Sequence, residues 1–264
     1  MRRRTSATAA VPVAVPAAVL VLAVAALTGC TSSGSGGTSA ARTATSGAPE
    51  AVGAPADATG AFDPELALAR RTREPYSATV HMTVETGSGD DRTEHTVDGR
   101  LNFNTKAAGG HTVARTEGPG LVTSTVEEMD VEGVGYERPG GEGGWQRSAN
   151  TGSSGAADKA AAYARAVLDT GTDARKGMET VAGVPVFHVG ARLTVEQVRT
   201  ADPENADRLS RQGVTGADCQ LWFDRLGRMV QGEQSLTFAG QVVVTRDLYT
   251  AFGPAEAFIA PLLG

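Results

Sequence analysis

Few residues of this chain have the types and the spacing that catalysis or metal binding requires. The four histidines are scattered singly along the sequence: His81, His95, His111 and His188. His81 and His95 fall on the polar phase of predicted strands, so solvated side chains are expected there and not metal ligands. The sequence contains no His-Glu-x-x-His zinc motif, no Gly-x-Ser-x-Gly nucleophile turn and no Gly-x-x-x-x-Gly-Lys phosphate loop. We therefore predict no metal site, no cofactor and no enzymatic activity.

An acidic run and one cysteine are further chemical candidates. The run comprises Glu127, Glu128, Asp130 and Glu132. It could attract calcium, but it lacks the Asp-x-Asp-x-Asp-Gly spacing that wraps oxygen ligands round one ion, so a solvated strand edge is expected. Cys219 alternates with Leu221 and Phe223, which indicates a buried thiol that packs as a small hydrophobe and not a nucleophile.

The other cysteine, Cys30, closes the motif Leu27-Thr28-Gly29-Cys30, which resembles the lipobox of bacterial lipoproteins. Three arginines at positions 2–4 and an apolar run over 9–26 precede it, the pattern of a secretory signal. The resemblance implies cleavage before Cys30, attachment of diacylglycerol to its thiol and acylation of the new amine, for example by palmitate. The protein would then be anchored in the cell membrane on its extracytoplasmic side. The alternative is a plain transmembrane anchor, since about 18 apolar residues can just span a bilayer.

The composition divides the chain into three segments. Residues 31–60 are almost all small or polar, with Val52 the only branched aliphatic residue, so this segment cannot bury enough apolar surface to fold. We predict a signal peptide over residues 1–29, a lipidated cysteine and flexible tether over 30–62, and one folded domain over 63–264. The formal net charge of -6 argues against a nucleic-acid partner.

Hydrophobic periodicity predicts strands at both ends of the domain and helices between them. Runs of β type, several with clear alternation of period two, predict strands over 76–85, 96–103, 112–117, 121–131, 134–137, 184–189, 217–223, 230–238 and 241–249. A helical period predicts a helix over 156–168. Thr194 with Gln197 and Asp202 with Pro203 are start signals for two further helices. Short turns between most strands favour the α+β fold class, an antiparallel sheet with helices on one face.

The order of these elements, together with several short motifs, resembles a known family. The motifs are Val134-Gly135-Tyr136 leading to Trp145, Val181-Ala182-Gly183-Val184 leading to Phe187-His188-Val189, Leu221-Trp222-Phe223-Asp224 with Gly227-Arg228, and Leu248-Tyr249 leading to Phe252-Gly253-Pro254. Over residues 65–262 the chain is similar to the actinobacterial LppX/LprA/LprF/LprG-type lipoproteins, whose fold is similar to that of the lipoprotein carrier LolA. The resemblance implies a strongly bent antiparallel sheet, a half-barrel, with helices on its concave face and an apolar cavity for acyl chains between them.

The apolar phases of the predicted strands would line that cavity. The candidates are Val80, Met82, Val84, Leu101, Phe103, Leu221, Phe223 and Phe238. An ordinary filled core is the alternative role for the same residues. The implied function is a non-catalytic lipoprotein that binds or carries lipids, with membrane lipid as its partner through the acylated Cys30. The second possibility is a LolA-like sensor or interaction module of the cell envelope that regulates a partner protein.

Overall fold

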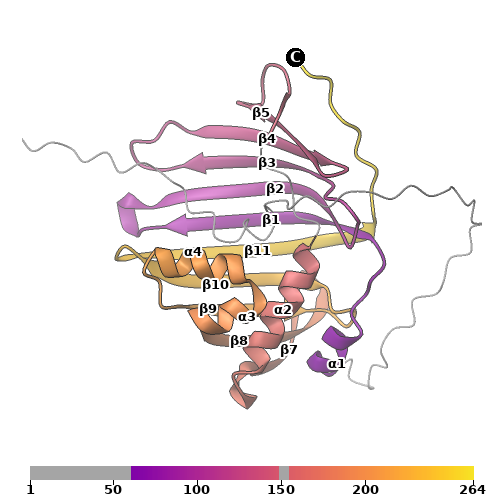
Figure 1. Cartoon of the computed structure of the whole chain (residues 1–264), viewed down its shortest axis with the longest axis vertical. Helices are drawn as coiled ribbons and strands as arrows, with labels where there is room; N and C mark the ends of the chain where they lie inside the picture. Colours follow the sequence, from indigo (N-terminus) through magenta and orange to yellow (C-terminus); the bar gives the residue numbers. More distant parts are fainter. Residues whose placement is uncertain (1–60, 149–154) are drawn as a thin grey trace, which may run out of the picture.

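The computed structural model describes residues 61–148 and 155–264. The predicted signal peptide, Cys30 and nearly all of the predicted tether lie outside these residues. The described part of the chain forms one curved antiparallel sheet with helices on one face (Figure 1). The predicted α+β fold class is therefore confirmed.

A single sheet contains eleven strands. They are β1 (Tyr76–Thr86), β2 (Thr93–Phe103), β3 (Gly110–Glu117), β4 (Ser124–Val131), β5 (Val134–Pro139), β6 (Gln146–Arg147), β7 (Arg175–Val181), β8 (Val184–Thr194), β9 (Gly216–Phe223), β10 (Met229–Phe238) and β11 (Gln241–Pro254). Their order across the sheet is β6-β5-β4-β3-β2-β1-β11-β10-β9-β8-β7, and every neighbouring pair is antiparallel. The chain thus forms two meanders, β1 to β6 and β7 to β11, which join where β11 pairs with β1.

The helices of the described residues are α1 (Pro64–Ala69), α2 (Ala156–Leu168), α3 (Val195–Ala201) and α4 (Pro203–Arg211). Both predicted start signals are confirmed. At α3 the Gln197 backbone N–H donates to Thr194 Oγ1 at 3.2 Å. At α4 the Asn205 backbone N–H donates to Asp202 Oδ1 at 3.2 Å, and Pro203 opens the helix. These caps satisfy backbone donors that the first helical turn leaves free.

Four strands differ from the sequence predictions: β6 and β7 were not predicted, and β8 and β11 extend beyond their predicted ends at residues 189 and 249. The edge strand β7 was not predicted, because most of its side chains are exposed and show no alternation. Its turn to β8 puts Ala182 at φ 48° and Gly183 at φ 80°, as the two central positions of a type I′ hairpin turn require. β11 runs beyond Tyr249 to Pro254, where it pairs with Tyr76 of β1.

Cross-strand register defines the face of the sheet that carries the helices, which we call the inner face. Residues paired across neighbouring strands share a face. One such row crosses eight strands, from β4 to β8: Val126, Ala114, Val97, Met82, Asp247, Gly232, Leu221 and Val189. Leu221 and Val189 pack with α2, α3 and α4, which places the row on the helix side. Only Asp247 interrupts its apolar character.

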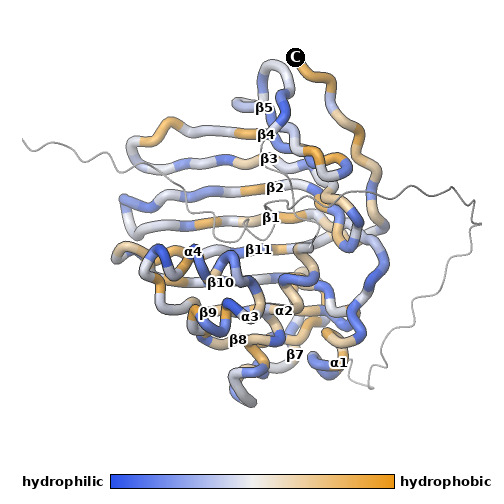
Figure 2. The backbone as a smooth tube through the Cα atoms, in the orientation of Figure 1, coloured by the Kyte–Doolittle hydropathy of each residue, from blue (hydrophilic) through white to orange (hydrophobic). Residues whose placement is uncertain are grey.

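Two apolar clusters occupy the inner face. The larger, which we call the helix-packed core, includes Ala164, Val167, Val198 and Leu209 from the helices and Val189, Leu193, Leu221 and Phe223 from the strands. The smaller, which we call the inner apolar cluster, comprises Val80, Met82, Val97 and Ala114, with Leu101 and Tyr249 packed against them. The helices pack mainly on β8, β9 and β10, and most of α4 is hydrophilic (Figure 2). The inner apolar cluster therefore lies on strands other than those that carry most of the helix packing, although Val80, Met82, Val97 and Ala114 are each at most 8% exposed.

Candidate binding site on the inner face of the sheet

The eight residues predicted to line a cavity all lie on the inner face. Met82 and Leu221 belong to the row that defines this face. The other six stand an even number of residues from a member of the row on the same strand, and such positions share a face of a strand. The period-two alternation of the sequence therefore assigned them to one side of the sheet.

The structure divides the eight residues between the two clusters. The helix-packed core holds four of them: Val84, Leu221, Phe223 and Phe238. The inner apolar cluster holds three: Val80, Met82 and Leu101. Phe103 lies at the end of this cluster, where its ring stacks on Tyr76 at 5.0 Å between centroids and meets Tyr249 edge-on at 5.7 Å. That any of the eight residues lines a cavity remains a prediction.

A carboxylic acid lies in the middle of the apolar row. Asp247 is paired with Met82 on one side and Gly232 on the other. A Cβ atom at Gly232 would lie 3.4 Å from Asp247 Oδ2, 3.5 Å from Met229 Sδ and 3.7 Å from Leu221 Cδ2. The carboxyl group thus extends over the glycine among apolar side chains. Burial raises the pKa of Asp247 to about 7, so its neutral and ionised forms coexist near neutral pH.

Tyr249, two residues further along β11, is a second polar group on the inner face. Burial raises its pKa well above the usual value, and the charges of Asp247 and Tyr76 raise it further. Within the part of the chain that the structure describes, neither the Asp247 carboxyl nor the Tyr249 hydroxyl has a hydrogen-bond partner. Both residues nevertheless keep some accessible surface. Asp247 and Tyr249 are thus partly exposed residues on the inner face whose polar groups have no partner among the described residues.

The acidic run is divided between the two faces of β4. Glu127 lies on the outer face, where Arg138 Nε donates to one oxygen at 2.9 Å and His111 Nε2 lies 2.7 Å from the other. Burial opposes ionisation of Glu127, but these two partners outweigh it and lower the pKa. Glu128 faces inward, and its pKa is raised by burial first and then by neighbouring carboxylates. Alternation along the strand thus separates the oxygens, and residues 61–148 and 155–264 contain no cluster placed to hold a metal ion.

The histidines do not converge on one another. His81 Nδ1 lies 2.6 Å from the exposed Asp98 carboxylate. His188 stacks on Trp222 with ring centroids 4.1 Å apart. His95 was expected on a solvated face, but it is partly buried on the inner face, and burial lowers its pKa.

Cys219 is a buried thiol, as predicted. Its side chain is 2% exposed and belongs to the helix-packed core. Burial raises the pKa of the thiol to about 11, which keeps it protonated near neutral pH. A protonated and enclosed thiol packs as a small hydrophobe and is a poor nucleophile.

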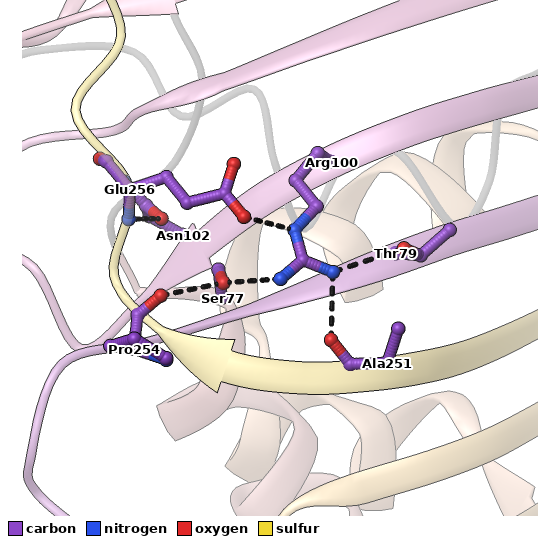
Figure 3. Close-up of polar contacts among 7 residues, drawn as sticks. All are labelled: Ser77, Thr79, Arg100, Asn102, Ala251, Pro254 and Glu256. Carbon is purple, nitrogen blue, oxygen red and sulfur yellow. Dashed lines mark hydrogen bonds and ion pairs between the residues drawn. The ribbon is translucent and has the colours of Figure 1, made fainter.

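An arginine on the outer face fixes the end of β11, a feature that the sequence analysis missed. Arg100 donates to Ser77 Oγ at 2.8 Å, to Thr79 Oγ1 at 3.0 Å and to the Ala251 carbonyl at 2.7 Å (Figure 3). Its Nε also donates to Glu256 in the segment that follows the strand, at 2.6 Å. These bonds hold β11 against β1 and so position Tyr249 on the opposite face. An isolated arginine in an alternating strand gives no sequence signal for such partners.

Among the residues that the structure describes, no helix has the length and apolar character needed to cross a membrane.

No protein-family model and no curated protein matches this chain. Among solved structures, LprF from Mycobacterium bovis is 16% identical with a TM-score of 0.43, over 78% of this chain and 100% of that one. LppX from Mycobacterium tuberculosis is 12% identical with a TM-score of 0.35, over 68% of this chain and 89% of that one. A LolA superfamily protein from Nitrosomonas europaea is 9% identical with a TM-score of 0.21, over 73% of this chain and 91% of that one. The solved structures similar to this chain thus include two lipoproteins, LprF and LppX, that the sequence resemblance names.

Proposed function

We propose that this protein is a membrane-anchored extracytoplasmic lipoprotein that binds or carries lipids on the inner face of its sheet, without catalysis. The position of the inner apolar cluster carries this proposal. In an ordinary filled core, helix side chains would pack over all the apolar residues of the inner face. Here the helices pack mainly on β8, β9 and β10, and Leu101 and Tyr249 at the cluster remain only partly buried. Val80, Met82, Val97 and Ala114 are each at most 8% exposed, so an acyl chain would add apolar contacts chiefly at Leu101 and Tyr249.

The inner apolar cluster also has the dimensions of an acyl chain. It extends over four neighbouring strands, β3, β2, β1 and β11. Strands lie about 4.8 Å apart, so three intervals span about 14 Å. This length is close to the depth of one bilayer leaflet, which is half of a hydrocarbon core of about 30 Å. Burial of about ten methylenes would stabilise a complex by roughly 8 kcal/mol before the entropic cost of binding.

Native mass spectrometry of the full chain, extracted from bacterial membranes in mild detergent, tests this function. We expect lipid that stays bound through exchange into a second detergent and leaves on denaturation, whereas a covalent anchor would remain. Absence of dissociable lipid, both as purified and after incubation with bacterial lipid extract, would contradict the proposal. A stoichiometric protein partner in place of lipid would instead support the sensor or interaction module.

We propose further that Cys30 carries the membrane anchor. The Cys30→Ala chain should lose its acyl groups and move from the membrane to the soluble fraction or remain unprocessed, because no thiol is present to accept diacylglycerol. Two or three acyl chains anchor stably, at about 0.8 kcal/mol per buried methylene, where one chain is marginal. Cell fractionation and intact mass measure the change.

Cys219→Ala is the matched control for the anchor. It removes the other cysteine, which is buried in the helix-packed core, and should leave membrane attachment unchanged. Equal processing and membrane attachment of the Cys30→Ala chain would show that the lipobox interpretation is wrong.

A further inference from the structure

We propose that Asp247 and Tyr249 form the polar end of the lipid site and select an acyl ester that carries a free hydroxyl group. The inference rests on the proposed function and adds the chemical class of the ligand. Asp247 is the one polar residue in the inner row that crosses eight strands.

The position of Asp247 is costly unless a ligand compensates for it. Apolar residues flank it across the sheet, Met82 on β1 and Leu221 beyond Gly232. A carboxyl group removed from water without a hydrogen bond destabilises a fold, and buried polar groups in proteins are almost always paired. Within the described residues Asp247 has no such partner, and the residue keeps some accessible surface. A partner from outside the protein would account for both facts.

The surroundings of Asp247 favour a neutral donor over a charged one. Burial alone accounts for its raised pKa, with no contribution from a neighbouring cation. A ligand carboxylate would bring a second negative charge into the same apolar surroundings, which is unfavourable. A hydroxyl group can donate to Asp247 in either protonation state, because one carboxyl oxygen always remains an acceptor.

Tyr249 supplies a hydrogen-bond donor that complements the acceptor oxygens of Asp247. It stands two residues from Asp247 on β11, so the two side chains share the inner face. A phenolic hydroxyl can donate to an ester carbonyl, while the neighbouring carboxyl accepts from a hydroxyl. Gly232 has no side chain of its own, and the Asp247 carboxyl extends over it: a Cβ there would already be in van der Waals contact with Asp247 Oδ2, Met229 Sδ and Leu221 Cδ2. The apolar chain would then extend over Val80, Met82 and Val97.

Isothermal titration calorimetry of the full-length protein with three probes of equal chain length tests this selection. Monolauroylglycerol carries hydroxyls and an ester, methyl laurate carries the ester alone, and laurate carries a carboxylate. We expect the wild-type protein to bind monolauroylglycerol about tenfold or more tightly than methyl laurate, since leaving Asp247 unpaired is unfavourable. Laurate should bind more weakly at pH 8 than at pH 6, because Asp247 is ionised at the higher pH.

Variants at position 247 assign the preference to this residue. Asp247→Leu should bind the two esters equally, and Asp247→Asn should keep part of the hydroxyl preference but lose the pH dependence for laurate. Asp98→Leu on the outer face, where the carboxylate is exposed, is the control and should keep the wild-type ratio. Circular dichroism verifies that each variant is folded.

The outcomes separate the two proposals. Equal binding of both esters by the wild-type protein, or an unchanged preference in Asp247→Leu, would overturn the selection while leaving lipid binding intact. Failure of the wild-type protein to bind any probe would overturn the proposed function and this inference with it.

Discussion

Phe223→Glu is expected to prevent the domain from folding at neutral pH, whereas Leu101→Glu is expected to leave it folded but without bound lipid. Phe223 is 2% exposed and belongs to the helix-packed core. A charge there has no access to water and costs several kcal/mol, against a total stability of about 5–15 kcal/mol. Leu101 is only partly buried at the inner apolar cluster, so a glutamate there can reach water. An acyl chain bound over this glutamate would remove its charge from water, which is unfavourable.

Circular dichroism with urea unfolding measures the first effect, and lipid content by mass spectrometry measures the second. Leu101→Met is the matched control, since it keeps an apolar side chain of similar volume and should retain lipid. Wild-type lipid content in a folded Leu101→Glu protein would exclude the inner apolar cluster as the site. Unfolding of Leu101→Glu, with no lipid in the wild-type protein, would instead identify the cluster as a filled core.

Asp247→Asn is expected to raise the free energy of unfolding above pH 7 and to remove a pH dependence between about pH 4 and pH 7. The pKa of Asp247 is raised by burial from 3.8 to about 7 in the folded state. The neutral form is therefore favoured in the fold, and its stabilising effect is complete below pH 4. That effect is lost as the pH rises through 7, because the unfolded chain ionises freely. A shift of about three pKa units corresponds to roughly 4 kcal/mol.

The measurement is urea unfolding of both proteins at pH 4.5, 6 and 8, expressed as the difference in free energy at each pH. Taking the difference cancels the titration of all other groups. Asp218→Asn is the control, since this exposed carboxylate pairs with Arg192 on the surface and such pairs contribute little. A constant difference between wild-type and Asp247→Asn proteins across this range would show that Asp247 is solvated in the fold.

Local patterns in the sequence determined much of the secondary structure. Period-two alternation around Met82 and Leu221 placed the eight cavity candidates on one face, because successive side chains of any strand point to opposite sides. The Thr194 and Asp202 caps fixed the starts of α3 and α4 through hydrogen bonds that span three residues. These signals need no knowledge of the rest of the fold.

Which side chains of β11 lie on the inner face was not evident from its sequence. Its inner positions include Val243, Thr245 and Asp247, while Val242 and Val244 point outward. Both phases of the strand are therefore mixed, and hydrophobicity alone would not orient it. Pairing with β1 on one side and β10 on the other sets the register, and the register places Asp247 on the inner face.

Only the tertiary structure decided which strands are neighbours, and with them the candidate site. β1 and β11 lie at opposite ends of the domain sequence, yet their pairing joins Met82 to Asp247 and unites the two meanders. No local propensity encodes such a contact, because the pairing of two strands far apart in sequence depends on how the whole sheet assembles. The position of the helices over β8, β9 and β10 likewise separated the inner apolar cluster from the helix-packed core. The sequence determined which side chains share a face, and long-range packing determined which of them the helices cover.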